Sequence, residues 1–240
     1  MDLSKLTEAA RKLLPLKYCG AVIVAAGNAS RMGGIDKVMA ELNGEPMIVR
    51  TVRTFQNCNA ISEIVIVTRP DLILPITKLT QDMYKVKAVV AGGSSRQESV
   101  HLGLNALSRK VKLAAIQDGA RPLITWEVID RVVRAAHTHG AAIPCVPVKD
   151  TIKVGNGGVV SETPDRATLF AAQTPQVFDF DLLRAALKKA EEDGANVTDD
   201  ASAVEHMGMA VKIVEGDERN IKVTTPMDLK IAEMLLEEVQ

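Results

Sequence analysis

Gly20-Ala-Val-Ile-Val-Ala-Ala-Gly27 is a run of small and β-branched apolar residues that ends abruptly at a glycine. The next ten residues, Asn28-Ala-Ser-Arg-Met-Gly-Gly-Ile-Asp-Lys37, are mostly polar or glycine and include Arg31 and Lys37. This order is typical of a buried parallel strand that leads into a phosphate-binding loop. The two cations indicate a polyanionic ligand, and the alternative is a solvated loop with two surface cations. The loop lacks both Gly-x-Gly-x-x-Gly and Gly-x-x-x-x-Gly-Lys-Ser/Thr, so it is neither a dinucleotide fingerprint nor a P-loop.

Apolar runs alternate with helical patterns over the first two thirds of the chain. We expect strands at 21–26, 63–68, 86–91, 113–117 and 141–148, and helices at 46–56, 71–83, 95–108 and 125–138. This alternation predicts βαβ units, and therefore an α/β fold with a mostly parallel sheet flanked by helices. The predicted strands are apolar on both faces, as a sheet covered by helices on both sides requires.

The pattern changes after residue 148. Asn156-Gly-Gly158 between two short alternating runs indicates a hairpin, so residues 149–165 are expected to form a projecting β-arm. We then expect a strand within 166–178 interrupted at Pro175, helices at 180–192, 199–207 and 225–238, and a strand at 209–214. Residues 1–18 have the pattern of an amphipathic helix, and residues 19–240 are expected to form a single domain.

Composition excludes several classes of protein. The 240 residues have a formal net charge of -1, which lacks the basic excess usual in nucleic-acid binders. The three cysteines are widely spaced and odd in number, which favours a reducing cytoplasm over a disulfide framework. No apolar run approaches the roughly 18 residues that span a bilayer, so no membrane partner is expected.

A second glycine loop follows the predicted strand at 86–91. Gly92 and Gly93 permit close backbone approach by a flat ligand such as a base. Ser99 lies in the next helix, where its hydroxyl could read a base edge. An ordinary helix start, capped by Ser94 or Ser95, is an equally good interpretation of this loop alone.

A third loop and a late lysine add charge to the same predicted sheet edge. Asp118 follows the strand at 113–117, a position that suits a ligand or a metal, although Arg121 could pair with it structurally. Lys222 is expected at the end of a short strand near the C-terminus and is the best candidate for a further phosphate contact, with a surface lysine as the alternative. Three loops at one edge of one sheet favour a binding site more strongly than any one loop does.

Taken together, the motifs resemble a known family. In order along the chain they are Ala25-Ala-Gly27 with Arg31 and Lys37, Gly92-Gly-x-x-Arg-x-x-Ser99, Asp118-x-Ala-Arg-Pro122, Val148-Lys-Asp-Thr-Ile-Lys153, Gln173-Thr-Pro-Gln176, Thr198-Asp-x-Ala-Ser202 and Asn220-Ile-Lys-Val-Thr224. The series is similar to the 2-C-methyl-D-erythritol 4-phosphate cytidylyltransferases, the CTP-using enzymes of the non-mevalonate isoprenoid pathway. It separates poorly from the sister enzymes that act on ribitol 5-phosphate, and a non-catalytic nucleotide-binding module is the alternative of another class.

The resemblance implies a Rossmann-like nucleotidyltransferase fold and a role for each matching residue. It implies catalytic roles for Arg31, Lys37 and Lys222, CTP binding by Ala25, Ala26, Gly27, Gly92, Gly93, Ser99, Asp118 and Gly119, and acceptor binding by Arg121, Thr151, Arg166, Thr174, Thr198 and Thr224. It further implies a sugar-alcohol phosphate as acceptor, Mg²⁺ or another divalent cation held mainly by the nucleotide phosphates, and a homodimer through the β-arm.

The chain departs from the family pattern at four positions in these loops. Asp36 and Val38 flank Lys37 where the family commonly has proline and glutamine. Gln117 stands where histidine is frequent before Asp118, and Gly119 stands where alanine is usual. These changes leave the expected cations in place, and Asp36 adds a negative charge beside them.

Overall fold

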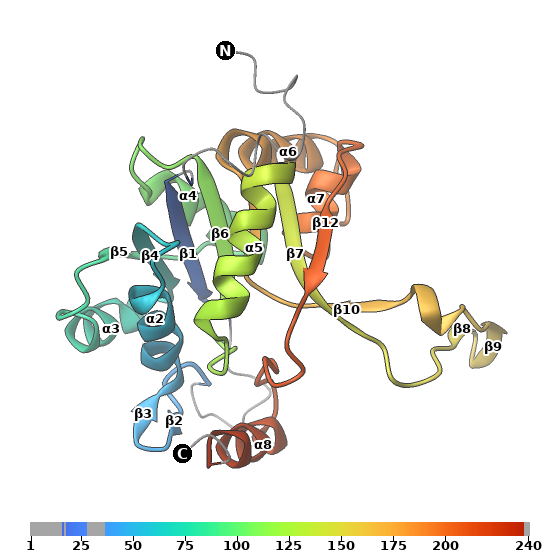
Figure 1. The fold of residues 1–240 in the computed structure, drawn as a ribbon, viewed down its shortest axis with the longest axis horizontal. Helices are drawn as coiled ribbons and strands as arrows, with labels where there is room; N and C mark the ends of the chain where they lie inside the picture. Colours follow the sequence, from blue (N-terminus) through green and yellow to red (C-terminus); the bar gives the residue numbers. More distant parts are fainter. Residues whose placement is uncertain (1–15, 17, 28–36, 238–240) are drawn as a thin grey trace.

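The fold is an eight-stranded sheet covered by helices on both faces, with a hairpin arm that projects to one side (Figure 1). The structure is a computed structural model that describes residues 16, 18–27 and 37–237. The predicted helix over residues 1–18 lies almost entirely outside the described residues, and the division into an extension and one domain stays a prediction. None of the helices in the described ranges is long and apolar enough to cross a membrane.

The order of elements follows the predicted alternation. The strands are β1 (Cys19–Ala25), β2 (Glu41–Leu42), β3 (Glu45–Pro46), β4 (Glu63–Thr68), β5 (Val86–Ala91), β6 (Leu113–Asp118), β7 (Ala141–Pro147), β8 (Val154–Asn156), β9 (Val159–Glu162), β10 (Phe170–Ala172), β11 (Gln176–Asp179) and β12 (Lys212–Glu215). The helices are α2 (Met47–Asn57), α3 (Ile73–Leu79), α4 (Arg96–Ala106), α5 (Trp126–His139), α6 (Phe180–Glu192), α7 (Asp200–His206) and α8 (Pro226–Glu237), with short 3-10 helices η2 (Pro70–Leu72) and η3 (Arg166–Thr168).

The central sheet is mixed but mostly parallel. Its main path runs β10-β7-β11-β6-β1-β4-β5, and β12 pairs with β7. The pairs β1–β4, β1–β6, β4–β5 and β7–β12 are parallel, whereas β10 and β11 run antiparallel to their neighbours. The carboxyl ends of β1, β5 and β6 therefore meet at one edge, where open α/β sheets bind ligands.

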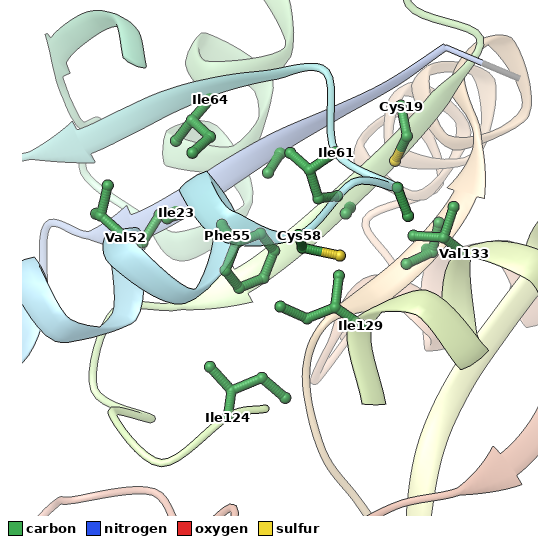
Figure 2. Close-up of a cluster of buried hydrophobic side chains, with 14 of the residues drawn as sticks. Cys19, Ile23, Val52, Phe55, Cys58, Ile61, Ile64, Ile124, Ile129 and Val133 are labelled. Carbon is green, nitrogen blue, oxygen red and sulfur yellow. The ribbon is translucent and has the colours of Figure 1, made fainter. Parts of the chain in front are cut away.

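Both faces of the sheet bury apolar side chains, as predicted. In β1, Ala21 and Ile23 point into one cluster and Val22 points into the other. The first cluster packs under α2 and α5 around Phe55 and Ile129, which Figure 2 shows between the two helices and the sheet. The second lies under α4, α6 and α7. Burying each such aliphatic or aromatic side chain contributes about 1.5–3 kcal/mol, so the two clusters hold the helices onto both faces of the sheet.

Several predicted boundaries were wrong in detail. The region expected to be one helix over 71–83 contains η2 and the seven-residue α3. The α-helix ends at Leu79 because a turn begins at Thr80. The region 166–178 contains η3, β10 and β11, and the peptide bond before Pro175 is cis. The strand expected at 209–214 begins only at Lys212, because Met207 and Gly208 first close the turn that ends α7.

The predicted helix starts and the arm were placed well. Ser95 caps α4 by accepting a hydrogen bond from the Glu98 backbone N–H, and Asp199 caps α7. The hydroxyl of Thr225 accepts a hydrogen bond from the Asp228 backbone N–H at the start of α8. The expected arm over 149–165 is confirmed as the β8–β9 hairpin, which turns at Gly157 and Gly158 with φ values of 57° and 81°.

Candidate active site

A cavity of about 370 Å³ opens at the carboxyl edge of the sheet. It lies where the chain leaves β1, β5 and β6, and residues from the segment before α8 close its far side. Its lining among the described residues is Val24, Ala25, Ala26, Gly27, Lys37, Val38, Gly93, Ser94, Ser95, Arg96, Ser99, Asp118, Ala120 and Lys222. The three loops singled out from the sequence thus meet in one cavity, whose described lining has three cations and a single carboxylate.

Close packing requires glycine at position 92 in the second loop. A Cβ at Gly92 would lie 2.4 Å from Cβ of Ala26 and 2.8 Å from Oγ of Ser99. Ser99 Oγ accepts a hydrogen bond from the Gly93 N–H at 3.1 Å and donates one to the Ser95 carbonyl at 2.8 Å. Ser99 therefore braces the loop in this structure, and its hydroxyl lies at the cavity wall.

The third loop is also closely packed, but less tightly than the second. A Cβ at Gly119 would lie 3.0 Å from Cδ1 of Ile48 and 3.1 Å from Cβ of Ala25. Thr51 Oγ1 donates a hydrogen bond to the Gly119 carbonyl at 3.2 Å, and the Gly119 N–H donates to the Val24 carbonyl. These contacts tie the end of β6 to β1 and α2, and they favour glycine at this position.

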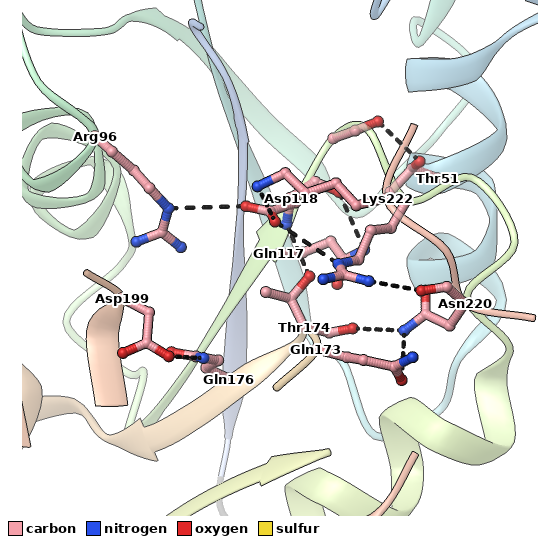
Figure 3. A network of polar contacts seen from close by, with 12 residues as sticks. Thr51, Arg96, Gln117, Asp118, Gln173, Thr174, Gln176, Asp199, Asn220 and Lys222 are labelled. Atoms are coloured by element: carbon pink, nitrogen blue, oxygen red, sulfur yellow. Dashed lines mark hydrogen bonds and ion pairs between the residues drawn. The ribbon is translucent and has the colours of Figure 1, made fainter. Parts of the chain in front are cut away.

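Asp118 is the centre of charge in the cavity (Figure 3). Its Oδ2 lies 2.8 Å from Nζ of Lys222 and 3.7 Å from Nε of Arg121, and its Oδ1 lies 3.8 Å from Nε of Arg96. Burial alone would raise the pKa of Asp118, but the charges of Lys222, Arg96 and Arg121 hold it below its ordinary value. The carboxylate is therefore ionised at neutral pH and fixes three cations around one point.

Backbone contacts hold Lys222 in place. Val223 N–H donates to the Ala120 carbonyl, and Arg121 Nη1 donates to the Asn220 carbonyl at 2.6 Å. Asn220 is fully buried and donates its side-chain amide to the Thr174 carbonyl at 3.0 Å. These bonds join residues 220–223 to the third loop and to the turn before β11.

Besides Arg121, which lies beside Asp118, the acceptor residues expected from the resemblance occupy four places. Thr174 lies under the cavity, where its Oγ1 accepts the Asp118 backbone N–H at 3.1 Å. Thr224 contacts Asp228 at the start of α8, and Thr198 is exposed and precedes the cap of α7. Thr151 lies on the arm and Arg166 follows it directly, where Arg166 donates to the Lys149 carbonyl, and neither lines the cavity.

Of the catalytic candidates in the first loop, the structure describes Lys37 but not Arg31. Lys37 lines the cavity, with its Nζ 4.0 Å from the position that a Cβ on Gly27 would take. Arg31 and Asp36 lie outside the described residues. Val38 is almost fully buried in the core, so the apolar residue after Lys37 anchors that end of the loop.

Two residues that the sequence did not single out belong to this cluster. Arg96 is the first residue of α4 and lines the cavity, and Asp200 is the first residue of α7 and pairs with it at 2.7 Å. Both lie inside quoted motifs, but their pairing joins positions 104 residues apart. Only the packing of α4 against the helices that follow β11 brings them together.

A preformed metal cage is absent from the described part of the chain, where no group of three His, Cys, Asp or Glu side chains could hold an ion. Asp118 is the one carboxylate in the described lining of the cavity. This donor set fits Mg²⁺, which usually takes one or two carboxylates and completes its shell with substrate phosphates and water.

Comparison with known proteins identifies the family. The family model for 2-C-methyl-D-erythritol 4-phosphate cytidylyltransferase matches residues 19–238. This chain belongs to that family. The family assignment covers all described strands and the cavity they form, and it accounts for the order of the sequence motifs.

Individual members of the family are similar over nearly the whole chain. The cytidylyltransferase of Symbiobacterium thermophilum is 47% identical over 90% of this chain and 92% of its own length, and that of Caldanaerobacter subterraneus is 43% identical over 90% and 97%. The crystal structure of 4-diphosphocytidyl-2C-methyl-D-erythritol synthase from Anaerococcus prevotii superposes with a TM-score of 0.84 at 30% identity, covering 92% of this chain and 96% of that one. The fold is therefore the Rossmann-like nucleotidyltransferase fold of the family.

Proposed function

We propose that this chain transfers a cytidylyl group from CTP to 2-C-methyl-D-erythritol 4-phosphate and releases pyrophosphate. The chain is a nucleotidyltransferase by family, and the non-mevalonate isoprenoid pathway is the setting of that reaction. The observation that carries the proposal is the cavity itself: Lys37, Arg96 and Lys222 line it, and Asp118, which pairs with Arg96 and Lys222, is the one carboxylate among its described lining residues.

The geometry suits transfer between two anions. An oxygen of the acceptor phosphate attacks the α-phosphorus of CTP in line. The bond between the α-phosphorus and the oxygen that bridges it to the β-phosphorus breaks, and pyrophosphate leaves with that oxygen. Such a transfer needs positioned cations more than covalent catalysis by the protein. The described lining offers those cations and contains no cysteine, and the three cysteines of the chain are buried elsewhere in the fold.

Different walls of the cavity suit different parts of the nucleotide. The Gly92–Gly93 loop lets a flat base approach the backbone next to Ser99. Lys37 beside Gly27, together with Arg31, would neutralise the triphosphate, and Lys222 would bind the reacting phosphates. Bound Mg²⁺ would supply further neutralisation of phosphate charge, with Asp118 as the available protein carboxylate.

The acceptor side is completed by a second copy of the chain in this proposal. The arm projects away from the sheet (Figure 1). Thr151 lies on it and Arg166 follows it directly, and exposed Val159 and Val160 give its tip apolar surface. A homodimer in which each arm reaches the partner would bring these side chains to a cavity. The buried free cysteines are compatible with the cytoplasm as the compartment.

The experiment that tests the activity is a pyrophosphate-release assay with CTP and Mg²⁺ and two acceptors in parallel. We expect release with 2-C-methyl-D-erythritol 4-phosphate and at most slow release with ribitol 5-phosphate. Preference for ribitol 5-phosphate would move the chain to the sister activity. Release with neither acceptor would leave only a nucleotide-binding module.

A further inference from the structure

Four side chains of alternating charge form a row, and three of them, Arg96, Asp118 and Lys222, line the cavity. Asp200 Oδ2 lies 2.7 Å from Nη2 of Arg96, Arg96 Nε lies 3.8 Å from Oδ1 of Asp118, and Asp118 Oδ2 lies 2.8 Å from Nζ of Lys222. They come from the first turn of α7, the first turn of α4, the end of β6 and the segment before α8. The row therefore connects a helix outside the cavity to the lysine inside it.

Asp200 is at the buried end of this row. Its side chain is 1% exposed, and its Oδ1 has no hydrogen-bond partner among the described residues. A buried carboxylate with one oxygen unpaired reduces stability, and apolar residues of similar size often stabilise such a site better. Packing alone therefore does not explain why an aspartate occupies the first position of α7.

Arg96 has the geometry of a fixed support. Its guanidinium is planar, and carboxylates contact it at Nε and Nη2. Its side chain keeps 33% of its surface exposed and lines the cavity, and Nη1 donates no hydrogen bond within the described structure. Because Asp200 holds Nη2, the planar guanidinium keeps one orientation, with Nε toward Asp118 and the rest of the group toward the cavity.

The two oxygens of Asp118 are divided between different cations. Arg96 lies on the Oδ1 side, whereas Lys222 and Arg121 lie on the Oδ2 side. With cations on both sides the carboxylate plane cannot rotate freely, and so the Lys222 ammonium keeps one position at the cavity wall.

We propose that Arg96 and Asp200 are positioning residues for Lys222: Asp200 holds Arg96, Arg96 fixes the Asp118 carboxylate, and Asp118 fixes the Lys222 ammonium. The proposal rests on the proposed cytidylyl transfer, in which Lys222 binds the reacting phosphates. The alternative is an ion pair that only fastens α7 to α4, in which case its loss changes stability and leaves the chemical step intact.

A double-mutant cycle separates these roles. The variants are Arg96→Gln, Asp200→Asn and the combination of both, each assayed for kcat and for the KM of CTP. We expect Arg96→Gln to lower kcat about 100-fold, the size of effect that a misplaced group causes. Asp200→Asn should lower kcat about tenfold, because a charge-assisted hydrogen bond becomes a neutral one. The KM of CTP should change little in both.

The decisive result is the double variant. If Asp200 acts only through Arg96, the double variant should have the kcat of Arg96→Gln within about twofold, because removing Asp200 has no further effect once Arg96 is absent. The proposal is overturned if the two single-variant losses in kcat multiply in the double variant. It is also overturned if the variants keep a normal kcat and only their melting temperature falls. Should Arg96→Gln fail to fold, Arg96→Lys replaces it in the cycle, because it keeps the charge but loses the planar fork.

Two controls accompany the cycle. Arg134→Gln breaks another short arginine–aspartate pair, with Asp130 at 2.6 Å on α5 away from the cavity, and it should leave kcat unchanged. The wild-type chain is assayed alongside. Absence of wild-type turnover contradicts the proposed function itself, whereas wild-type turnover with unaffected variants contradicts only the positioning role.

Discussion

Asp118 is the residue on which the charges of the cavity converge. Burial opposes its ionisation, and Lys222, Arg96 and Arg121 outweigh burial, so its pKa in the folded chain lies below the ordinary value. The ionised carboxylate therefore stabilises the fold above the ordinary pKa of aspartate, and this contribution is lost as the pH falls through the lowered folded-state pKa.

Lys222 makes the closest contact to this carboxylate, which leads to a prediction about its titration. Lys222→Met should raise the pKa of Asp118, because it removes both the nearest charge and a hydrogen bond at 2.8 Å. An NMR titration of the side-chain carboxyl carbons measures the change. Lys188→Met, which removes an exposed lysine 3.4 Å from Glu192, is the matched control and should leave Asp118 unaffected. An unchanged Asp118 titration in Lys222→Met would show that the ion pair is absent in solution.

Lys37 gives the residue-level prediction for catalysis. Lys37→Ala should lower kcat by about 10²–10³, the usual loss for one preorganised charge-stabilising group. The fold should survive, because Lys37 lies at the cavity wall and the neighbouring Val38 supplies the buried contact. Steady-state kinetics combined with a thermal melt tests both statements. Near-normal kcat would remove Lys37 from the catalytic role.

At the scale of elements, the loop between β5 and α4 depends on having no side chain at Gly92. Gly92→Ala would place a Cβ 2.4 Å from Ala26 and 2.8 Å from Ser99, so the loop must shift away from β1. We expect weaker CTP binding, by about tenfold or more, since the loop and the end of β1 both line the cavity. Isothermal titration calorimetry with CTP and Mg²⁺ measures the loss.

Gly155→Ala is the matched control for this substitution. Gly155 lies in β8, and a Cβ there would meet only the Val159 carbonyl oxygen at 3.9 Å, an ordinary contact. This variant should bind CTP as the wild type does. Equal CTP affinity in both alanine variants would mean that the Gly92 loop does not form part of the nucleotide site.

Local patterns predicted most elements, and long-range pairing explains the remainder. The central strands were recognisable because they are apolar on both faces, and α4, α7 and α8 because Ser95, Asp199 and Thr225 precede them. The pairing of Arg96 with Asp200 could not be read from the sequence, because it depends on how α4 and α7 pack in space.

The candidate site was predictable to a similar extent. Three loops after parallel strands meet by topology alone, so the position of the cavity followed from the sequence order. The hydrogen bonds of Ser99 within its own loop did not follow, nor did the burial of Val38 beside Lys37. Both depend on side chains from neighbouring strands and helices.

At the scale of the whole molecule, the arm is the feature from which we propose a homodimer. Thr151 lies on the arm and Arg166 follows it directly, and neither lines the cavity of the same chain. They can contribute to an acceptor site only if a second copy brings its arm to that cavity. The apolar tip formed by Val159 and Val160 favours such a contact over full exposure to water.

A complementation experiment tests this assembly. Arg166→Ala should raise the KM of the acceptor far more than that of CTP, and Lys37→Ala should lose kcat. Subunits of the two variants, unfolded and refolded together, should regain about a quarter of wild-type activity at low acceptor concentration, because half of the dimers are mixed and each has one intact site. Light scattering verifies the dimer. A mixture no more active than the mean of its components would place Arg166 in the same subunit as Lys37, or outside the site.

The crystal structure of the chain with CTP and Mg²⁺ tests the central assignment most directly. We expect the cytosine against Gly92 and Gly93 beside Ser99, and the triphosphate between Gly27 and Lys37 with its α-phosphate facing Lys222. Nucleotide bound in the separate cavity between α4 and α6, or bound in the Asp118 cavity with base and phosphates exchanged, would contradict the assignment.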